Sequence, residues 1–313
     1  MNKDFLNYEQ QLDYLENEKE LIIPSREYAR EMLDRYSYYS LIGGYKQPFK
    51  HKLSGKYLRG VTFNEIVSFY IFDEKLRSLF LQYILHIERH LKSMISYYFC
   101  EKHGASQSEY LNPQNFGNGI NANADEISRL IKTMAKVISL PSSYSYIIHH
   151  VKKYHNVPLW VAVNAMTFGT ISKFFQYMPN DLQTKVALNY PGFSEKLLHQ
   201  MITAVAKCRN VCAHGERLYN LRMRAAIPDT VLHHKLKIPQ KKGRYVCGRH
   251  DLFAVVIALR YLLPNAEFKS FKRDLQRLIT QLSKDCPHIS NEQILSEMGF
   301  PANWKRITSF KKV

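Results

Sequence analysis

The sequence predicts an all-α fold on three observations. Apolar residues recur at three- and four-residue steps over long stretches, as in helices with one buried face. The 13 glycines and 12 prolines are fewer than usual in 313 residues and form no regular series of turn signals, which disfavours an all-β chain. With 45% hydrophobic and 23% charged residues, the chain has the composition of a folded globular protein rather than a disordered one. No segment repeats at a fixed period, which disfavours a solenoid.

Caps and apolar spacing locate the helices in order. Ser25 can cap a helix that starts at Arg26 and runs to about Tyr39, where a glycine pair follows. Apolar side chains then recur at helical steps from about residue 64 to 102, which predicts one very long helix that ends at Gly104. Further helical patterns cover residues 124–139, 143–154, 157–166, 169–178, 181–188, 194–213, 250–263 and 268–284.

We expect three regions in the chain. An N-terminal helical and basic segment, residues 1–63, packs on a helical core, residues 64–285, and a C-terminal extension covers residues 286–313. Within the core, residues 112–123 are rich in glycine and asparagine and predict a polar loop. Residues 233–250 contain a proline and a glycine among many cations and predict a basic loop or short hairpin.

The charge balance favours an anionic partner. The chain carries 44 Lys and Arg against 27 Asp and Glu, a net charge of +17, which points first to nucleic acid and second to a membrane surface. The N-terminus is polar and unlike a secretory signal, and the most apolar run, residues 252–263, is interrupted by Arg260 and is shorter than the roughly 20 residues that span a bilayer. Five thinly spread cysteines favour a reducing compartment. We therefore expect a cytoplasmic protein that does not span a membrane.

Two basic stretches contain no acidic residue, residues 35–64 and residues 233–250. Aromatic side chains among cations suit single-stranded nucleic acid, because bases stack on rings while cations bind phosphates. The alternative, which we favour for the first stretch, is a solvated loop whose aromatic side chains dock on the core. The candidate RNA-binding residues in the two stretches are Lys50, Lys52, Lys56, Arg59, Lys241, Lys242, Arg244 and Tyr245.

One motif carries residue types with a clear chemical use: Arg209, Asn210 and His214 near the end of a predicted helix. Gly215 follows at once and is expected to end that helix, leaving His214 at its C-terminus. On an ideal helix, Arg209 and His214 point about 140° apart, since each residue turns 100°. His214 falls one turn after Asn210, on the same side of the helix.

These residue types suit cleavage of RNA without a metal ion or cofactor. The ribose 2′-OH attacks the adjacent phosphate when a base removes its proton and an acid protonates the leaving oxygen. Histidine is the side chain that changes charge near neutral pH. Arginine offers a planar fork for phosphate oxygens and stabilises the charge that develops on them. On residue types alone, we favour the simpler explanation of an ordinary helix end whose histidine suits the helix dipole.

For the other candidate sites, we favour simple structural explanations. Cys208, Cys212 and Cys247 near two histidines could suggest zinc, but the spacing lacks a Cys-x2-Cys pair, and Cys208 and Cys212 lie on the apolar stripe of their helix. We therefore expect no metal site. Glu88 on an apolar helix could orient a catalytic group, or it could be a buried acid paired with Arg77 or Arg89, which we favour. The pairs His149–His150 and His233–His234 are expected on the surface.

The context of the motif resembles the Abi-like proteins of the AbiD/AbiF type, which belong to the HEPN superfamily of helical ribonucleases. The stretch from Arg209 to Asn220, which reads RNVCAHGERLYN, is similar to that family's signature with its Arg-x4–6-His motif. Four other segments are similar to the family in the same order along the chain: residues 39–49, residues 70–77 with 87–89, residues 158–160 with 168–172, and residues 299–304.

The resemblance implies a HEPN-type helical bundle with additional N-terminal and C-terminal helices. It implies metal-independent RNA cleavage that leaves a cyclic phosphate, and a homodimer in which two copies of the motif meet at one cleft. It also implies a toxin-like role in abortive infection or toxin–antitoxin control, with a small structured RNA as antitoxin in some relatives. The residues carried over are Arg209, Asn210 and His214, with Arg217 and Asn220 as weaker RNA-binding candidates. The alternative from another class is a non-cleaving helical protein that binds RNA or a partner.

Overall fold

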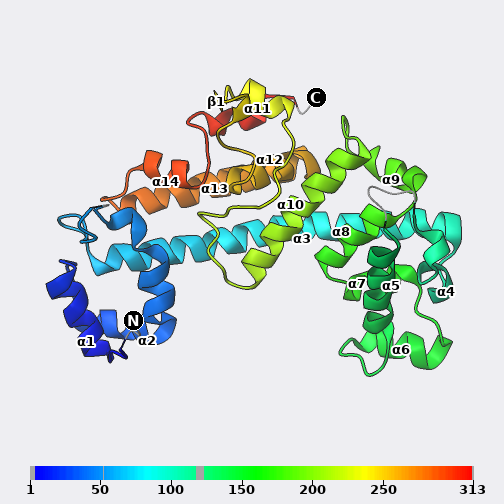
Figure 1. Cartoon of the computed structure of the whole chain (residues 1–313), viewed down its shortest axis with the longest axis horizontal. Coiled ribbons are helices and arrows are strands. Elements are labelled where there is room, and N and C mark those ends of the chain that lie inside the picture. Colours follow the sequence, from blue (N-terminus) through cyan, green and yellow to red (C-terminus); the bar gives the residue numbers. More distant parts are fainter. Residues whose placement is uncertain (1–3, 52, 118–122, 312–313) are drawn as a thin grey trace.

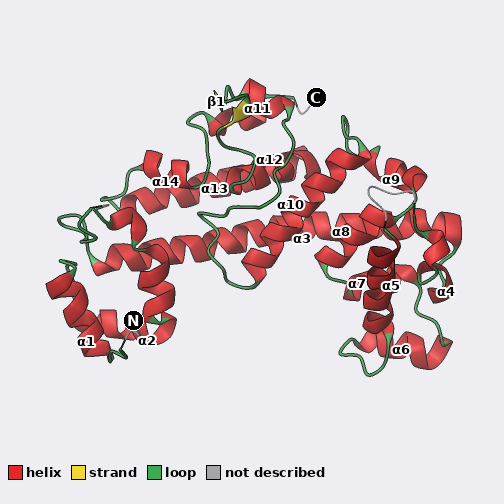
Figure 2. Cartoon of the chain, in the orientation of Figure 1, coloured by secondary structure: helices red, strands yellow, loops and turns green. Residues whose placement is uncertain are grey.

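The computed structural model describes residues 4–51, 53–117 and 123–311, and the regular secondary structure of this part of the chain is almost wholly helical (Figure 1). Figure 2 shows that strands are confined to one small hairpin among the described residues. The hairpin pairs β1 (Gln240–Lys241) with β2 (Arg244–Tyr245) in antiparallel register. The all-α prediction is confirmed, and so is the short hairpin within residues 233–250.

The helices follow in three groups along the chain. The N-terminal elements are α1 (Tyr8–Asp13), the π-helical turn η1 (Tyr14–Glu18), α2 (Arg26–Tyr36), η2 (Tyr39–Gly43) and η3 (Gln47–Phe49). The central elements are α3 (Phe63–His103), α4 (Gln107–Tyr110), η4 (Pro113–Asn115), α5 (Ala124–Ile138), α6 (Ser145–Tyr154), α7 (Leu159–Ala165), α8 (Phe168–Tyr177), α9 (Asn180–Ala187) and α10 (Glu195–Ala213). The C-terminal elements are α11 (Val231–Lys235), α12 (Leu252–Leu262), α13 (Asn265–Asp285), α14 (Asn291–Glu297) and η5 (Trp304–Ser309).

Helix α3 organises the molecule. Its 41 residues begin at a capping box, in which the Thr62 hydroxyl accepts the Glu65 backbone N–H and the Glu65 carboxylate accepts the Thr62 backbone N–H. It ends at Gly104, whose φ of 88° closes the last turn. In Figure 1 the N-terminal elements lie at one end of α3, the group α4–α9 lies at the other end, and α10 crosses its middle. Helices α10 and α13 both pack on α3, which explains why apolar residues recur along its whole length.

The apolar run at 252–263 is a core helix. Every residue of α12 is buried, and α10 and α13 pack against it. Arg260 is accommodated because its guanidinium donates hydrogen bonds to Asn265 Oδ1 at 2.6 Å and to the Phe310 carbonyl at 3.2 Å. Among the described residues, no helix combines the length and apolarity that crossing a membrane requires.

The basic stretch 35–64 packs its aromatic side chains inward. Tyr45, Phe49 and Tyr57 are 2%, 0% and 3% exposed, so they belong to the core and are closed to a nucleic-acid base. The docked-loop interpretation of this stretch is therefore correct, because three large rings there gain more by burial than by facing water. His233, expected on the surface, is fully buried as well.

Candidate active site at the end of helix α10

Helix α10 ends where the sequence predicts. Gly215 adopts a left-handed conformation with φ of 67°, its N–H bonds to the Cys212 carbonyl at 3.3 Å, and the Glu216 N–H bonds to the Val211 carbonyl at 3.1 Å. This pair of bonds is the Schellman arrangement that closes a helix. His214 is the C-cap residue, and its side chain is exposed at the helix end. Asn210, one turn earlier, is exposed too, and its carbonyl accepts the His214 N–H at 3.0 Å.

Arg209 is held from behind by an acid of α3. Its side chain is 28% exposed, and its Nε lies 3.5 Å from Oε2 of Glu88, which is 5% exposed. The other carboxylate oxygen of Glu88 lies 2.9 Å from Lys92 Nζ, one turn further along α3. The expected pairing of Glu88 with Arg77 or Arg89 is wrong: Arg77 binds Asp73, and Arg89 donates to the Leu85 carbonyl. The reason is the crossing of the two helices, which turns Glu88 toward α10.

A second buried acid, Asp73, organises the loop that follows the motif. It is 0% exposed, and its carboxylate accepts backbone N–H groups of Leu218 and Tyr219 at 3.1 and 2.7 Å. It also accepts the Tyr45 hydroxyl at 2.7 Å and pairs with Arg77 at 2.7 Å. Burial raises the pKa of Asp73, an effect that the tyrosine, the two amides and Arg77 oppose. This acid thus joins α3, the N-terminal segment and the loop after α10.

Arg217 completes the connection to the N-terminal segment. Its guanidinium donates to the Gly44 carbonyl at 2.9 Å. A Cβ at position 44 would lie 3.3 Å from Arg217 Cδ, so the glycine leaves room for the arginine to lie close across the backbone. Three segments that resembled the Abi-like pattern, residues 39–49, 70–77 and 209–220, are therefore adjacent in space.

A pocket of about 530 Å³ opens between these segments. Arg217 and Asn220, two of the weaker candidates, line it, and so do Lys207 and Arg222, which sequence reasoning missed. The main motif residues Arg209, Asn210 and His214 are not part of its lining, although Val211 and Gly215 are. We call this cavity the tyrosine pocket, defined by its lining residues Tyr39, Ser40, Gly43, Gly44, Tyr45, Tyr70, Lys207, Val211, Gly215, Glu216, Arg217, Asn220, Leu221 and Arg222.

Two of the basic candidates of residues 35–64, Lys50 and Lys56, have partners within the protein. Lys50 lies 4.7 Å from the centre of the Tyr57 ring, and burial lowers its pKa to about 8. Lys56 forms an ion pair with Glu20. Arg59 is exposed, and Lys52 lies outside the described residues.

The candidates at the hairpin have a different setting. Lys241, Lys242 and Arg244 are exposed, whereas Tyr245 packs on the buried His233 with ring centres 4.9 Å apart. In Figure 1 the hairpin and the C-terminal end of α10 lie on opposite sides of α3. The structure therefore does not bring the hairpin cations to the motif.

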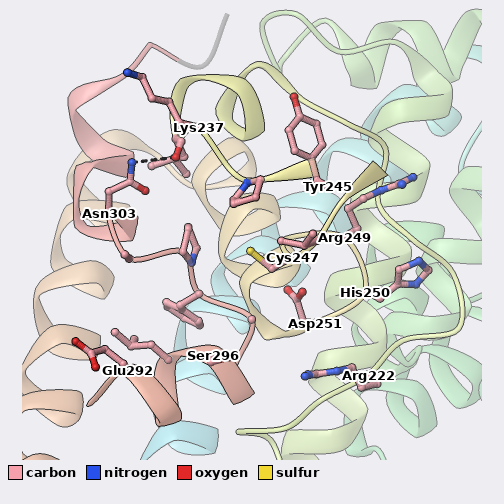
Figure 3. Close-up of a pocket in the computed structure, with 18 residues that line it drawn as sticks. Arg222, Lys237, Tyr245, Cys247, Arg249, His250, Asp251, Glu292, Ser296 and Asn303 are labelled. Atoms are coloured by element: carbon pink, nitrogen blue, oxygen red, sulfur yellow. Dashed lines mark hydrogen bonds between the residues drawn. The ribbon is translucent and has the colours of Figure 1, made fainter. Parts of the chain in front are cut away.

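A larger pocket of about 800 Å³ lies beside the hairpin. Figure 3 shows it with Tyr245 and Arg222 at opposite ends and Cys247 and Asp251 between them. Asp251 is 6% exposed because it caps α12, accepting the backbone N–H groups of Gly248 and Ala254. Burial raises the pKa of Cys247 to about 12, so its thiol is not a ready nucleophile. Asp251 is therefore explained by its structural role as the cap of α12.

Lys207 could have been found from the sequence by following the exposed face of α10. His199, Thr203, Lys207, Asn210 and His214 succeed one another at three- and four-residue steps and share one side of the helix. Asp73 and Arg222 carried no such signal, because the contacts that place them here join distant residues: Asp73 accepts the Leu218 and Tyr219 N–H groups, and Arg222 donates to the Glu297 carbonyl.

Three comparisons with known proteins bear on identity. No curated protein matches the chain, and no solved structure matches it. A family model described as Abi-like protein matches residues 31–220, which is more than half of the chain. That match includes the motif, Glu88, Asp73 and the N-terminal wall of the tyrosine pocket, and it stops before the hairpin. The chain therefore belongs to the Abi-like protein family, and this membership implies a role in abortive infection or defence.

Proposed function

We propose that the protein is a metal-independent endoribonuclease of the HEPN type that acts as a toxin in abortive infection. The observation that carries the proposal is the end of α10, where His214 is exposed and Arg209 is paired with the buried Glu88. A solvent-exposed arginine would have many rotamers, whereas a buried acid restrains this one. A restrained cation and an exposed imidazole are the two groups that cleavage of a phosphodiester by an internal hydroxyl requires.

Cleavage of this kind transfers two protons and exchanges one bond to phosphorus for another. A base removes the proton of the ribose 2′-OH, the 2′ oxygen forms a bond to phosphorus, and the bond from phosphorus to the 5′ oxygen of the next nucleotide breaks. An acid gives that oxygen a proton, so the products are a 2′,3′-cyclic phosphate and a 5′-hydroxyl. His214 is assigned to proton transfer, Arg209 to the charge on the phosphate oxygens, and Asn210 to hydrogen bonds with the phosphate or the imidazole.

Glu88 is assigned as a positioning residue rather than a catalytic one, since it faces Arg209 and is closed to solvent. Replacing it with glutamine keeps its shape and removes the charge that restrains Arg209. We expect Glu88→Gln to slow cleavage severalfold, because the 3.5 Å ion pair that restrains Arg209 is lost. Combined with Arg209→Ala, it should cause no further loss, and additive losses would instead indicate a role of Glu88 unconnected to Arg209.

The first experiment measures RNA cleavage by purified protein. Wild type should cleave a mixed-sequence RNA in the presence of EDTA and leave 2′,3′-cyclic phosphate ends, which mass spectrometry identifies. His214→Ala and Arg209→Ala should lose at least about a hundredfold in rate, as removal of an acid–base group or of an oxyanion ligand does. His149→Ala and Arg129→Ala, which change exposed residues of α6 and α5, are matched controls and should cleave normally.

Two results would contradict the proposed ribonuclease activity. Activity that EDTA abolishes and a divalent ion restores would contradict the metal-independent reaction. RNA binding by wild type without any cleavage would favour the alternative, a non-cleaving RNA-binding or partner-binding protein. Expression in bacteria adds a cellular test: wild type should arrest growth with RNA decay, and His214→Ala should not.

We also propose that two copies of the chain form the active cleft. On an ideal helix Arg209 and His214 diverge by about 140°, so a two-fold pair of chains brings the two residues to one phosphate more readily than one chain does. Co-expression of Arg209→Ala with His214→Ala should partly restore cleavage, with the active species a dimer by light scattering. Full activity in a strictly monomeric fraction would contradict the shared cleft.

A further inference from the structure

The tyrosine pocket combines a solvent-facing aromatic ring with cations directly beside the motif. Tyr39 is 86% exposed, although a tyrosine ring normally gains by burial. Its ring lies 3.6 Å from where a Cβ of Gly43 would stand, so it rests on the backbone of η2. Tyr70, on the α3 wall, is fixed by ring contacts with Tyr36 at 4.5 Å and Tyr45 at 5.2 Å. The pocket therefore has one open ring and one immobilised ring.

The cations of the pocket are positioned to bind an anion. The side chain of Lys207 is exposed and has no ion-pair or hydrogen-bond partner in the described ranges of the chain. Arg217 is anchored by the Gly44 carbonyl, and Arg222 by the Leu221 and Glu297 carbonyls at 2.8 and 2.9 Å. These carbonyl partners carry no formal charge, so they position the guanidinium groups without neutralising them; the carboxylates of Asp251 and Glu297 also act on Arg222, but neither lines the pocket. Against these three cations the lining holds one exposed carboxylate, Glu216.

The pocket continues along α10 rather than ending at Arg222. A second hollow of about 610 Å³ shares Lys207 and Arg222 with it and is lined further by His199 and Thr203 of α10 and by residues 223–227. The exposed face of α10 thus carries one track that starts in the tyrosine pocket and follows the helix toward its N-terminus. Asn210 and His214 lie on the same face of the helix as Lys207 and Thr203.

We infer that the tyrosine pocket binds one nucleotide of a single-stranded RNA, with the base stacked on Tyr39 and flanking phosphates at Lys207 and Arg222. This inference rests on the proposed function, because it places the bound nucleotide next to His214, where the scissile phosphate would lie. Single-stranded RNA fits because it offers unstacked bases to a ring and phosphates to cations, whereas a duplex hides its bases. The volume of about 530 Å³ lies in the range of small-ligand pockets.

The test measures binding in the absence of cleavage, so the His214→Ala protein is the reference. Its affinity for a fluorescently labelled unpaired RNA of eight nucleotides is measured by anisotropy at several salt concentrations. Adding Tyr39→Ala should weaken binding roughly ten- to a hundredfold, the usual effect of losing one stacked base, while Tyr39→Phe should preserve it. Tyr154→Ala, which removes a 54% exposed tyrosine of α6, is the matched control and should bind normally.

The charge of Lys207 and the position of the bound RNA are tested in the same His214→Ala protein. Lys207→Gln should flatten the slope of log K against log salt by about 0.7, the value for one single-strand phosphate, and Lys132→Gln on α5 should leave it unchanged. An RNA with one 4-thiouridine should crosslink to the segments around Tyr39 and Lys207, as peptide mass spectrometry locates.

The outcomes separate this inference from the proposed function. Normal binding by the Tyr39→Ala protein, equal affinity for a duplex, crosslinks confined to the hairpin, or no RNA binding at all would overturn the nucleotide pocket. Wild-type cleavage together with normal binding by Tyr39→Ala would leave the ribonuclease standing without the pocket. If RNA binding depends on Tyr39 but the wild type does not cleave RNA, the nucleotide pocket would stand and the proposed ribonuclease activity would not.

Discussion

The two acid-free basic segments, residues 35–64 and 233–250, are similar in composition but differ in what they expose to water. In the first, the rings of Tyr45, Phe49 and Tyr57 are buried, and the cations Lys50 and Lys56 contact other groups of the protein. In the second, three cations are exposed at the tip of a hairpin. The first segment therefore contributes packing, including a wall of the tyrosine pocket, whereas the second leaves its cations facing solvent.

The difference follows from where each segment is attached. Tyr45 of the first segment bonds to the buried Asp73, and Gly44 accepts Arg217 from the loop after the motif, so the segment is tied into the candidate active site. The hairpin is tied at its base by His233 of α11, a helix that lies away from the end of α10 in Figure 1. The two segments are therefore less alike than their compositions suggest. Substitutions in each should have separable effects on stability and on RNA binding.

The largest expected effect comes from Asp73, which ties the first segment to the motif loop. Asp73→Asn leaves Arg77 as a buried charge without its partner, which typically costs about 3–5 kcal/mol of unfolding free energy. Because the motif loop is bound to the same carboxylate, RNA binding should fall as well. Urea unfolding measures the first effect and anisotropy the second.

The neighbouring acid Glu74 is the control for Asp73. It is exposed on the next position of α3, so Glu74→Gln should change stability by less than about 0.5 kcal/mol. If Asp73→Asn proves as mild as Glu74→Gln, the buried network does not tie the two segments together.

Much of the fold could be predicted because its signals are local. Caps and breakers such as Ser25 and Gly215 act within a few residues, and the apolar spacing that indicates α3 is continuous over its length. The end of α10 at His214 followed from the same kind of signal.

The contacts that build the candidate site depend instead on how distant segments cross. Glu88 meets Arg209 because α10 crosses α3 at that turn, and no spacing within α3 reveals it. Asp73 is separated by 145 residues from the backbone N–H of Leu218 that it accepts. The exposed ring of Tyr39 and the buried ring of Tyr45 occur six residues apart in similar surroundings, so only tertiary packing distinguishes them.

An effect of intermediate size is expected from pH, through His233, which attaches the hairpin to the rest of the protein. Burial lowers the pKa of His233, whose Nδ1 accepts the Thr230 N–H while Nε2 donates to the Gly248 carbonyl. The folded state therefore binds fewer protons at this site than the unfolded state, and stability falls as pH drops below the ordinary histidine pKa of about 6.5. Hairpin amides should lose hydrogen-exchange protection severalfold between about pH 7.5 and pH 5.

The variant His233→Gln isolates that effect, because glutamine keeps an acceptor and a donor but does not titrate in this range. His103 and His199 also have lowered pKa values from burial, so the comparison is the difference between wild type and this variant. An identical pH response in both proteins would assign the loss to another group.

The smallest effect on stability, and the sharpest contrast with Asp73, is expected at the hairpin tip. Replacing Lys241, Lys242 and Arg244 together with glutamine should change the unfolding free energy by less than about 0.5 kcal/mol, because all three side chains are exposed. If the tip binds RNA, the slope of log K against log salt should flatten by about 0.7 for each phosphate that the variant no longer neutralises. The control replaces Arg129, Lys132 and Lys136, which removes the same charge from the exposed side of α5. Equal salt slopes in the two triple variants would mean that the hairpin contributes only to the general positive field of the protein.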